Sequence, residues 1–183
     1  MRFILASGSP RRIEILKEYG YNFETIQTEV DETTHYRRPH LIVMDIAFKK
    51  AFPVSQKNPS ALVLAADTLV YCDGRILGKP KNIDEAKKML RLESGKWQSV
   101  YTGICLLCIS KKIKIIDYEK SRCYMRKLSE KEIDEIAHKH LDKAGGWGVQ
   151  DKNDILITKI IGSYYNVVGL PIEKLNKILE RLL

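Results

Sequence analysis

The sequence predicts an α/β fold whose sheet has substantial antiparallel character. Residues 61–66, Ala-Leu-Val-Leu-Ala-Ala, form a continuous apolar run, which is the pattern of a strand covered on both faces. Two long strand-like segments, 98–110 and 113–126, are joined by a short polar turn and therefore predict an antiparallel pair. Stretches with helix-start signals lie before and after these strands, so strands and helices share the chain as in a mixed α/β protein.

The first sixty residues predict two strands and two helices. Residues 3–6 form a short apolar strand, and a helix with proline at its first position follows over 10–19, stopped by a glycine. Residues 22–28 alternate weakly and predict a strand. A second proline opens a helix over 39–52, and the prolines at both ends of 53–59 bracket a polar connector.

The middle of the chain begins with the apolar strand 61–66, which we expect to end at Asp67-Thr68. An Asp-Gly pair within 69–77 is a strong signal for a two-residue hairpin turn. Asn82 is a typical N-cap with glutamate three residues later, and it predicts a helix that ends near Gly95.

The last third combines a glycine-rich loop with further strands and helices. A capping box at Ser129 predicts a helix to about residue 140, and residues 142–150 form the loop. Strands are expected over 155–161 and 164–168. A final amphipathic helix begins after Pro171.

Length and composition indicate one globular domain, residues 1–183, with room for a sizeable core. A net charge of +8 favours an anionic ligand, and nucleic acid, nucleotide or an acidic surface would fit it equally well. The longest apolar run, 104–109, is far too short to span a membrane, and the N-terminal run is too short for a signal peptide. We therefore expect a cytoplasmic protein whose four cysteines are reduced thiols.

The N-terminal turn predicts an anion-binding site. With Ser9 as N-cap, Arg11 and Arg12 fall in the first turn of a helix. The helix dipole is positive there, so two cations are unfavourable unless an anion neutralises them. Backbone N–H groups, two guanidinium groups and the hydroxyls of Ser7 and Ser9 could hold that anion. The alternative is an exposed arginine pair beside a surface carboxylate.

Acidic residues supply the candidate catalytic group and metal ligands. Asp67 and Thr68 follow a buried strand, where ligands bind in α/β sheets, and Asp67 could bind a divalent metal or accept a proton from water. The alternative is an aspartate that caps a turn. Asp31 and Glu32 lie in an acidic loop, and one of them could share a metal with Asp67.

Three lysines lie beside turns or glycines: Lys50, Lys79 and Lys143. Each alone could be an ordinary solvated charge, but together with Arg11 and Arg12 they would suit a triphosphate. The P-loop pattern Gly-Lys-Ser/Thr at the start of a helix is missing from the sequence, which argues against a P-loop kinase or GTPase.

Other candidates for chemistry are weak. Cys105 and Cys108 have the spacing of zinc ligands, but on a strand such residues point to opposite faces. His138 and His140 do not face each other on a helix. The aromatic residues show no stacking arrangement with basic residues that would bind single-stranded nucleic acid.

Short motifs are spread over nearly the whole chain: Leu5–Arg12, Val30–Glu32, Ala47–Ala51, Ala66–Thr68, Gly78–Pro80, Ser94–Gly95, Tyr101–Gly103, Asp142–Gly145, Val149–Gln150, Gly162–Tyr164 and Val168–Pro171. In these residues and in their order, the chain resembles the Maf family of nucleoside triphosphate pyrophosphatases. The resemblance implies a mixed, twisted sheet with helices on both sides, and two lobes around a deep nucleotide-binding cleft. It also implies hydrolysis of a nucleoside triphosphate to its monophosphate and pyrophosphate, with Mg²⁺ or Mn²⁺ as the divalent metal.

The resemblance assigns roles to individual residues. Asp67 matches the proton acceptor, and we expect Glu32 and Asp67 to hold the metal. Gln150 and Arg11 match the branch of the family that acts on dTTP and UTP. The 7-methyl-GTP branch has an acidic residue in place of Gln150 and lacks the arginine that matches Arg11. The expected substrate-binding residues are Ser7, Arg11, Arg12, Lys50, Thr68, Lys79, Lys143 and Gln150.

The sequence departs from the family pattern after Gln150, where Asp151–Asp154 replaces a glycine-rich turn, and this affects the expected base pocket. The family implies removal of surplus or non-standard nucleotides, a link to arrested division and a possible homodimer, with neither membrane nor nucleic acid as partner. The alternatives are a basic nucleic-acid-binding module without turnover, a nucleotidyltransferase that uses the same triphosphate site and a 7-methyl-GTP-type pyrophosphatase.

Overall fold

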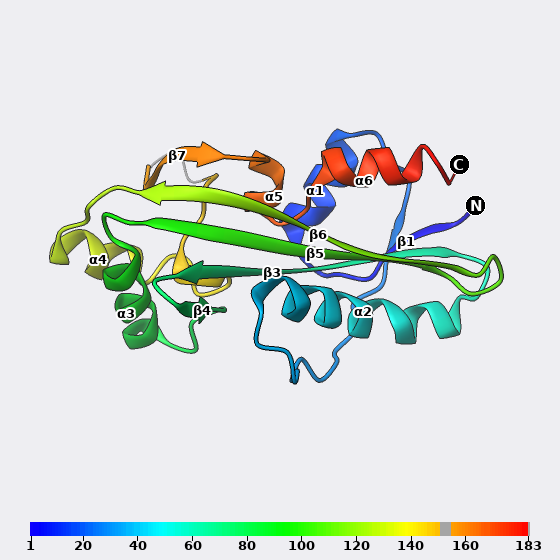
Figure 1. Cartoon of the computed structure of the whole chain (residues 1–183), viewed down its shortest axis with the longest axis horizontal. Coiled ribbons are helices and arrows are strands. Elements are labelled where there is room, and N and C mark those ends of the chain that lie inside the picture. Colours follow the sequence, from blue (N-terminus) through cyan, green and yellow to red (C-terminus); the bar gives the residue numbers. More distant parts are fainter. Residues whose placement is uncertain (151–154, 183) are drawn as a thin grey trace. The chain divides into compact units, whose positions relative to one another are not determined.

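The computed structural model describes residues 1–150 and 155–182. The chain forms two compact units. The first consists of Met1–Asp67, Thr102–Glu119 and Gly169–Leu183, and the second of Thr68–Tyr101 and Lys120–Val168. Three long strands contribute residues to both units: β3 (Leu62–Cys72), β5 (Trp97–Cys108) and β6 (Ile113–Met125) (Figure 1).

The described residues form a seven-stranded sheet with parallel and antiparallel pairs, which confirms the predicted mixed α/β fold. The strand order is β2-β1-β3-β5-β6-β7, and β4 pairs with β3 beside this path. Strand β1 (Phe3–Leu5) is parallel to β2 (Glu24–Thr25) and to β3. Strands β4 (Arg75–Leu77) and β7 (Ile157–Ile161) are antiparallel to β3 and β6.

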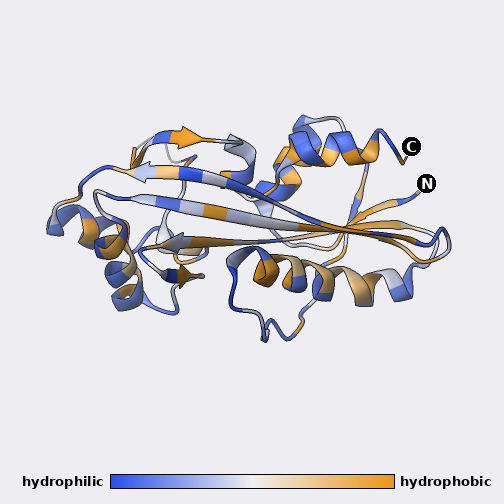
Figure 2. Ribbon diagram, in the orientation of Figure 1, coloured by the Kyte–Doolittle hydropathy of each residue, from blue (hydrophilic) through white to orange (hydrophobic). Residues whose placement is uncertain are grey.

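The first unit has helices on both faces of its strands. On one face, α2 (Pro39–Lys57) packs its alanines against alternate residues of β1 and β3. Residues of opposite parity, such as Leu5 and Leu64, are also fully buried, and α1 (Pro10–Glu18) and α6 (Ile172–Leu179) bury their apolar sides. Apolar residues accordingly gather on α2 and along the neighbouring strands (Figure 2).

Helix α2 contacts β5 through backbone at one point. A side chain at Gly103 would lie against the Val43 carbonyl group and 2.7 Å from the Met44 nitrogen. No side-chain movement can relieve such an overlap, because all of these atoms belong to the main chain. Glycine at position 103 therefore sets the distance between helix and strand.

The second unit packs its helices against one face of its strands. Helices α3 (Ile83–Glu93) and α4 (Glu130–Ile136) bury a cluster that includes Val100 and Met125. Both predicted caps are present: the Asn82 side chain accepts the Glu85 N–H, and Ser129 forms a complete capping box with Glu132. The 3₁₀ turn η1 (Ala144–Gly146) and helix α5 (Tyr164–Val168) complete the unit.

The predicted hairpin is confirmed, but the strand before it is longer than expected. Asp73 and Gly74, both with positive φ, connect the paired residues Cys72 and Arg75. Strand β3 does not end at Asp67-Thr68 but continues to Cys72. The Asp67 carboxylate accepts a hydrogen bond from Lys50, so a polar residue is accommodated within the strand.

Several predicted bounds were wrong because tertiary contacts outweigh local signals. Pro53 lies inside α2, whose following turn buries Val54 and continues to Lys57. Helix α4 ends at residue 136 instead of 140, and β2 spans only residues 24–25. Residues 164–168 are a helix, not a strand.

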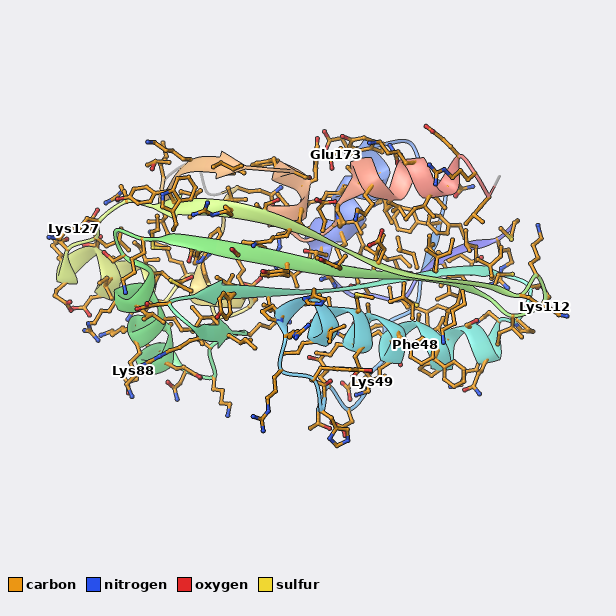
Figure 3. All side chains as sticks on the ribbon, viewed as in Figure 1. Phe48, Lys49, Lys88, Lys112, Lys127 and Glu173 are labelled. Carbon is orange, nitrogen blue, oxygen red and sulfur yellow. The ribbon has the colours of Figure 1, made fainter. Side chains whose placement is uncertain are left out.

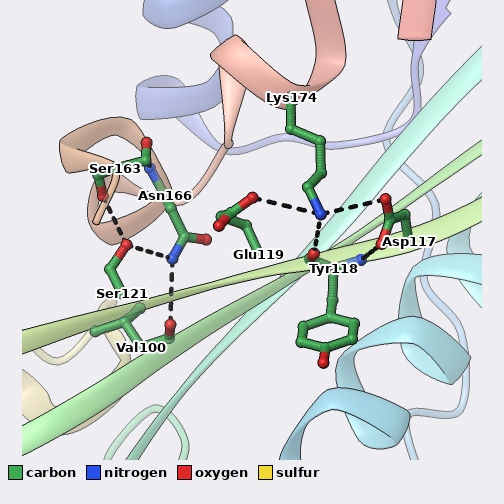
Figure 4. Close-up of polar contacts among 8 residues, drawn as sticks. All are labelled: Val100, Asp117, Tyr118, Glu119, Ser121, Ser163, Asn166 and Lys174. Atoms are coloured by element: carbon green, nitrogen blue, oxygen red, sulfur yellow. Dashed lines mark hydrogen bonds and ion pairs between the residues drawn. The ribbon is translucent and has the colours of Figure 1, made fainter. Parts of the chain in front are cut away.

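Helix α5 is held by a buried amide. The Ser163 hydroxyl accepts the Asn166 N–H, and the Asn166 side chain donates to the Val100 carbonyl at 3.2 Å and to Ser121 Oγ at 3.0 Å. Figure 4 shows these contacts, together with Lys174, which bonds the Tyr118 carbonyl and pairs with Asp117. The Asn166 bonds explain why an aromatic and β-branched segment forms a helix.

Charged groups and thiols are distributed as expected from the composition. Lys88, Lys112 and Lys127 are exposed and come from separate segments (Figure 3). All four cysteines are buried free thiols. Burial raises the pKa of Cys72 to about 11 and that of Cys105 and Cys123 to about 12.

No helix in the described part of the chain is long and apolar enough to cross a membrane.

Replacement of Gly103 by alanine should destabilise the first unit, since the added methyl group overlaps the α2 backbone. We expect a loss of about 2 kcal/mol or more in the free energy of unfolding, measured by urea denaturation. Gly78→Ala is the matched control, because nothing lies within 4 Å of its added carbon. Equal stability of the two variants would contradict the close helix–strand contact.

Glu132→Gln should lower the melting temperature at pH 7, and the difference from the wild type should shrink on acidification. Hydrogen bonds from Arg126 and Ser129 lower the pKa of Glu132 from 4.5 to about 2. A lowered folded-state pKa stabilises the protein above pH 4.5, and this stabilisation is lost as the pH falls toward 2. Thermal scans at several pH values, with the exposed Glu135→Gln as control, would measure it; a constant difference would argue against the role of these bonds.

Candidate functional site

The first turn of helix α1 carries two cations and contains no acidic residue. Ser9 is the N-cap with extended backbone, but its side chain makes no capping hydrogen bond. Pro10 opens the helix, Arg11 and Arg12 follow, and the first turn has no acidic residue. The positive end of the helix dipole therefore adds to two guanidinium charges, which confirms the arrangement expected from the sequence.

Hydrogen bonds to Gly169 and Ser7 hold the Arg12 side chain within its own unit. Its Nε donates to the Gly169 carbonyl at 2.9 Å, and Nη1 donates to Ser7 Oγ at 3.1 Å. Burial lowers the pKa of Arg12, while the nearby carboxylates of Asp67 and Glu32 oppose that shift. The Gly169 carbonyl was not anticipated from the sequence, although the Val168–Pro171 motif lies around it.

Lys50 lies between two carboxylates. Its ammonium group is 2.7 Å from Asp67 Oδ1 and 2.8 Å from Glu32 Oε1. Lys50 and Asp67 side chains are only 16% and 14% exposed, whereas Glu32 is 56% exposed, so the first pair is protected from solvent and the second is open to it. Helix α2 supplies the lysine and β3 supplies the aspartate.

Asp31 takes a different role from its neighbour. Its carboxylate accepts the Thr33 N–H at 2.9 Å and the Thr33 hydroxyl at 2.8 Å, which closes the acidic loop on itself. These bonds lower the pKa of Asp31. Of the two acidic residues considered from the sequence, Glu32 is thus the one that approaches Asp67 through a shared partner.

The second unit carries the remaining candidates. Lys79 is exposed in the loop after β4, and Lys143 precedes η1 and pairs with Asp142 at 2.9 Å. The Gly145 N–H donates to the Gly78 carbonyl at 3.0 Å, so the two lysine-bearing loops are hydrogen-bonded to each other. Gln150 is exposed at the end of the second loop.

The predicted site residues therefore form two groups. The first group lies within the first unit: Arg12 is hydrogen-bonded to Ser7, and Lys50 pairs with Glu32 and Asp67. Arg11 lies close enough to lower the pKa of Arg12. Thr68 follows Asp67 on β3 but belongs to the second unit, as do Lys79, Lys143 and Gln150. The departure at residues 151–154 lies outside the described residues.

The carboxylate pair of Glu32 and Asp67 suits a hard divalent cation. Both contact one positive charge, the Lys50 ammonium group, so an oxygen of each carboxylate faces the same cationic group. Residues 1–150 and 155–182 contain no group of three or more His, Cys, Asp or Glu side chains that could hold a metal ion. Two carboxylates still fit Mg²⁺, which commonly takes one or two from the protein and its other ligands from water and substrate phosphates.

The fold is similar to that of a solved structure, the Ham1 protein of Staphylococcus aureus. The two share a TM-score of 0.50 at 13% identity, over 68% of this chain and 72% of the other. This likeness defines the architecture as an α/β fold of the Ham1 type.

The family model described as Maf-like protein matches residues 2–182. The chain belongs to the Maf family. It is 49% identical over 180 residues to the dTTP/UTP pyrophosphatase of Elusimicrobium minutum, with 98% of each chain covered. It is 46% identical to the protein of the same name from Caldicellulosiruptor bescii, over 99% of this chain and 94% of the relative.

Proposed function

We propose that this chain is a nucleoside triphosphate pyrophosphatase that hydrolyses dTTP and UTP to the monophosphate and pyrophosphate. The observation that carries the proposal is the first-unit group in which Lys50 joins Glu32 and Asp67 beside the uncapped start of α1. Relatives of nearly equal length bear the name of this activity. The proposal treats residues 1–183 as one functional domain, active in the cytoplasm, and the buried reduced cysteines support that location.

In the proposed reaction, water attacks the α-phosphorus of the triphosphate. Asp67 accepts a proton from this water, the bond from the α-phosphorus to the bridging oxygen breaks, and pyrophosphate leaves with the electron pair. Asp67 is well placed for this role because its side chain is largely buried and Lys50 fixes one of its oxygens at 2.7 Å. A fixed, shielded carboxylate needs little rearrangement before it takes the proton.

The proposed cationic groups would stabilise the negative charge that develops on the leaving pyrophosphate. Arg12 is already oriented by Ser7 and Gly169, so its guanidinium group can meet a phosphate without losing side-chain freedom. Lys50, Lys79 and Lys143 would contact the remaining phosphate oxygens. Glu32 and Asp67 would hold Mg²⁺ or Mn²⁺, which supplies further neutralisation of the triphosphate.

Base selection is proposed for Gln150, together with Arg11 and Thr68. The Gln150 amide has both a donor and an acceptor, and the O4/N3–H edge of uracil or thymine offers the complementary pair. The exposed position of Gln150 at the end of its loop leaves this amide accessible to a ligand.

A pyrophosphate-release assay over a nucleotide panel, with and without Mg²⁺, tests the proposal. We expect Mg²⁺-dependent turnover of dTTP and UTP without any acceptor molecule, and loss of turnover by about 10²–10⁴-fold in Asp67→Asn with its melting temperature retained. Asp45→Asn removes an acid that pairs with Lys49 on α2 and serves as the control. Salt-dependent DNA binding without turnover would contradict the proposed pyrophosphatase activity. Near wild-type rates in Asp67→Asn would contradict the role of Asp67 as proton acceptor.

Gln150→Glu should weaken the preference for dTTP over GTP. The change replaces an amide, which can donate and accept, with a carboxylate that only accepts and repels the O4 of the pyrimidine. We expect the ratio of kcat/KM values for the two nucleotides to fall by about tenfold or more. An unchanged ratio would remove Gln150 from base selection.

A further inference from the structure

The second unit buries a carboxyl group that the proposed reaction does not use. Glu93, the last residue of α3, is 0% exposed. Its Oε1 accepts a hydrogen bond from Trp147 Nε1 at 2.9 Å, and Trp147 is itself 4% exposed. Among the described residues, Oε2 of Glu93 has no hydrogen-bond partner.

Stability alone does not account for this glutamate. The residues around it form the apolar cluster of the second unit, which includes Leu90 of the same helix. A carboxyl group with one hydrogen bond is costly in such surroundings, and the negative end of the helix dipole adds to the cost of a charge. Burial raises the pKa of Glu93 well above its usual value, more than the Trp147 bond lowers it. Leucine would fill a similar volume without this penalty.

The Glu93 carboxyl group lies against the loop that contains Gly145. Gly145 has φ of 73°, and a side-chain carbon there would lie 2.6 Å from Trp147 Nε1 and 2.8 Å from Glu93 Oε1. The loop backbone thus rests directly on the Glu93–Trp147 hydrogen bond. Because the Gly145 N–H also bonds the Gly78 carbonyl, the same point anchors the loop that carries Lys79.

The anchor lies within the segment that carries two proposed substrate contacts. Lys143 accepts the Gly146 N–H on its carbonyl at 3.0 Å, and its side chain runs so close to Gly148 that an added carbon would be 3.0 Å from Lys143 Cε. Gln150 follows two residues after Gly148. Trp147 therefore lies between the two in sequence, and its large side chain is buried.

We infer that Glu93 is a positioning residue: through its hydrogen bond to Trp147 it fixes the loop from Lys143 to Gln150 for nucleotide binding and base selection. The inference rests on the proposed function and deepens it. Glu93 touches neither the substrate nor the reacting atoms, so its effect passes entirely through the indole N–H. A neutral acceptor of the same shape would serve equally well.

Four single variants and one double variant test the inference. Glu93→Gln keeps an acceptor, Glu93→Leu removes it, and Trp147→Phe removes the donor; the double variant lacks both. Trp97→Phe is the control, because this second tryptophan is 36% exposed on β5. For each protein we would record the indole N–H signals by ¹⁵N NMR, the melting temperature, and kcat and KM for dTTP and GTP.

We expect Glu93→Gln to keep the exchange protection of the Trp147 indole N–H, and to retain wild-type selectivity. Glu93→Leu should lose that protection, raise KM for dTTP about tenfold and reduce the dTTP-to-GTP preference, while kcat changes less. Trp147→Phe should change KM and the nucleotide preference as Glu93→Leu does. The double variant should lose no more of the preference than either single variant, since all three break the same hydrogen bond. Should Glu93→Leu not fold, Trp147→Phe gives the same test.

Two results would overturn the inference while leaving the proposed function intact. One is an active wild type whose nucleotide preference is unchanged in Glu93→Leu and Trp147→Phe. The other is a loss of kcat/KM that is equal for dTTP and GTP and parallels the fall in melting temperature, as a merely structural role would give. Absence of dTTP and UTP turnover in the wild type would instead overturn the proposed function, and the role of Glu93 in it.

Discussion

Much of the first unit depends on the contact between α2 and Gly103. Main-chain atoms meet there without an intervening side chain, so the helix cannot shift toward or away from the sheet without breaking a contact. Lys50 lies two turns further along the same helix and reaches Asp67 on β3 at 2.7 Å. A hydrogen bond of this length requires both elements to be fixed, and a glycine far from Asp67 in sequence contributes to that.

The two units differ in how they support their candidate residues. In the first, charged groups support each other: Lys50 is shared by two carboxylates, and Arg12 is held by a hydroxyl and a carbonyl. In the second, the loops that carry Lys79 and Lys143 are hydrogen-bonded to each other, and the buried Glu93–Trp147 hydrogen bond lies against the second loop. The role inferred for Glu93 would make nucleotide selection depend on a residue that does not touch the ligand.

The sequence was sufficient for most elements because their signals are local. Caps at Asn82 and Ser129, the Asp-Gly turn and the apolar strand patterns each act within a few residues. The sequence was insufficient where a residue far away in the chain determines the local structure. Strand β3 can continue past Asp67 because Lys50, which belongs to α2, donates a hydrogen bond to the Asp67 carboxylate. Helix α5 is stabilised because Val100 and Ser121 accept hydrogen bonds from the Asn166 amide. For the same reason the sequence could group the charged motifs but could not reveal the Gly169 carbonyl or the Glu93–Trp147 bond.

The burial of all four thiols has a practical consequence. A thiol with a pKa of 11 or 12 is almost entirely protonated at neutral pH, and the protonated form reacts poorly with alkylating reagents. Because all four native thiols are also buried, a cysteine introduced on the surface would react with a maleimide dye well before them. Site-specific fluorescent or spin labels could be attached without first removing the native cysteines, which would make the motion of individual loops directly observable in solution.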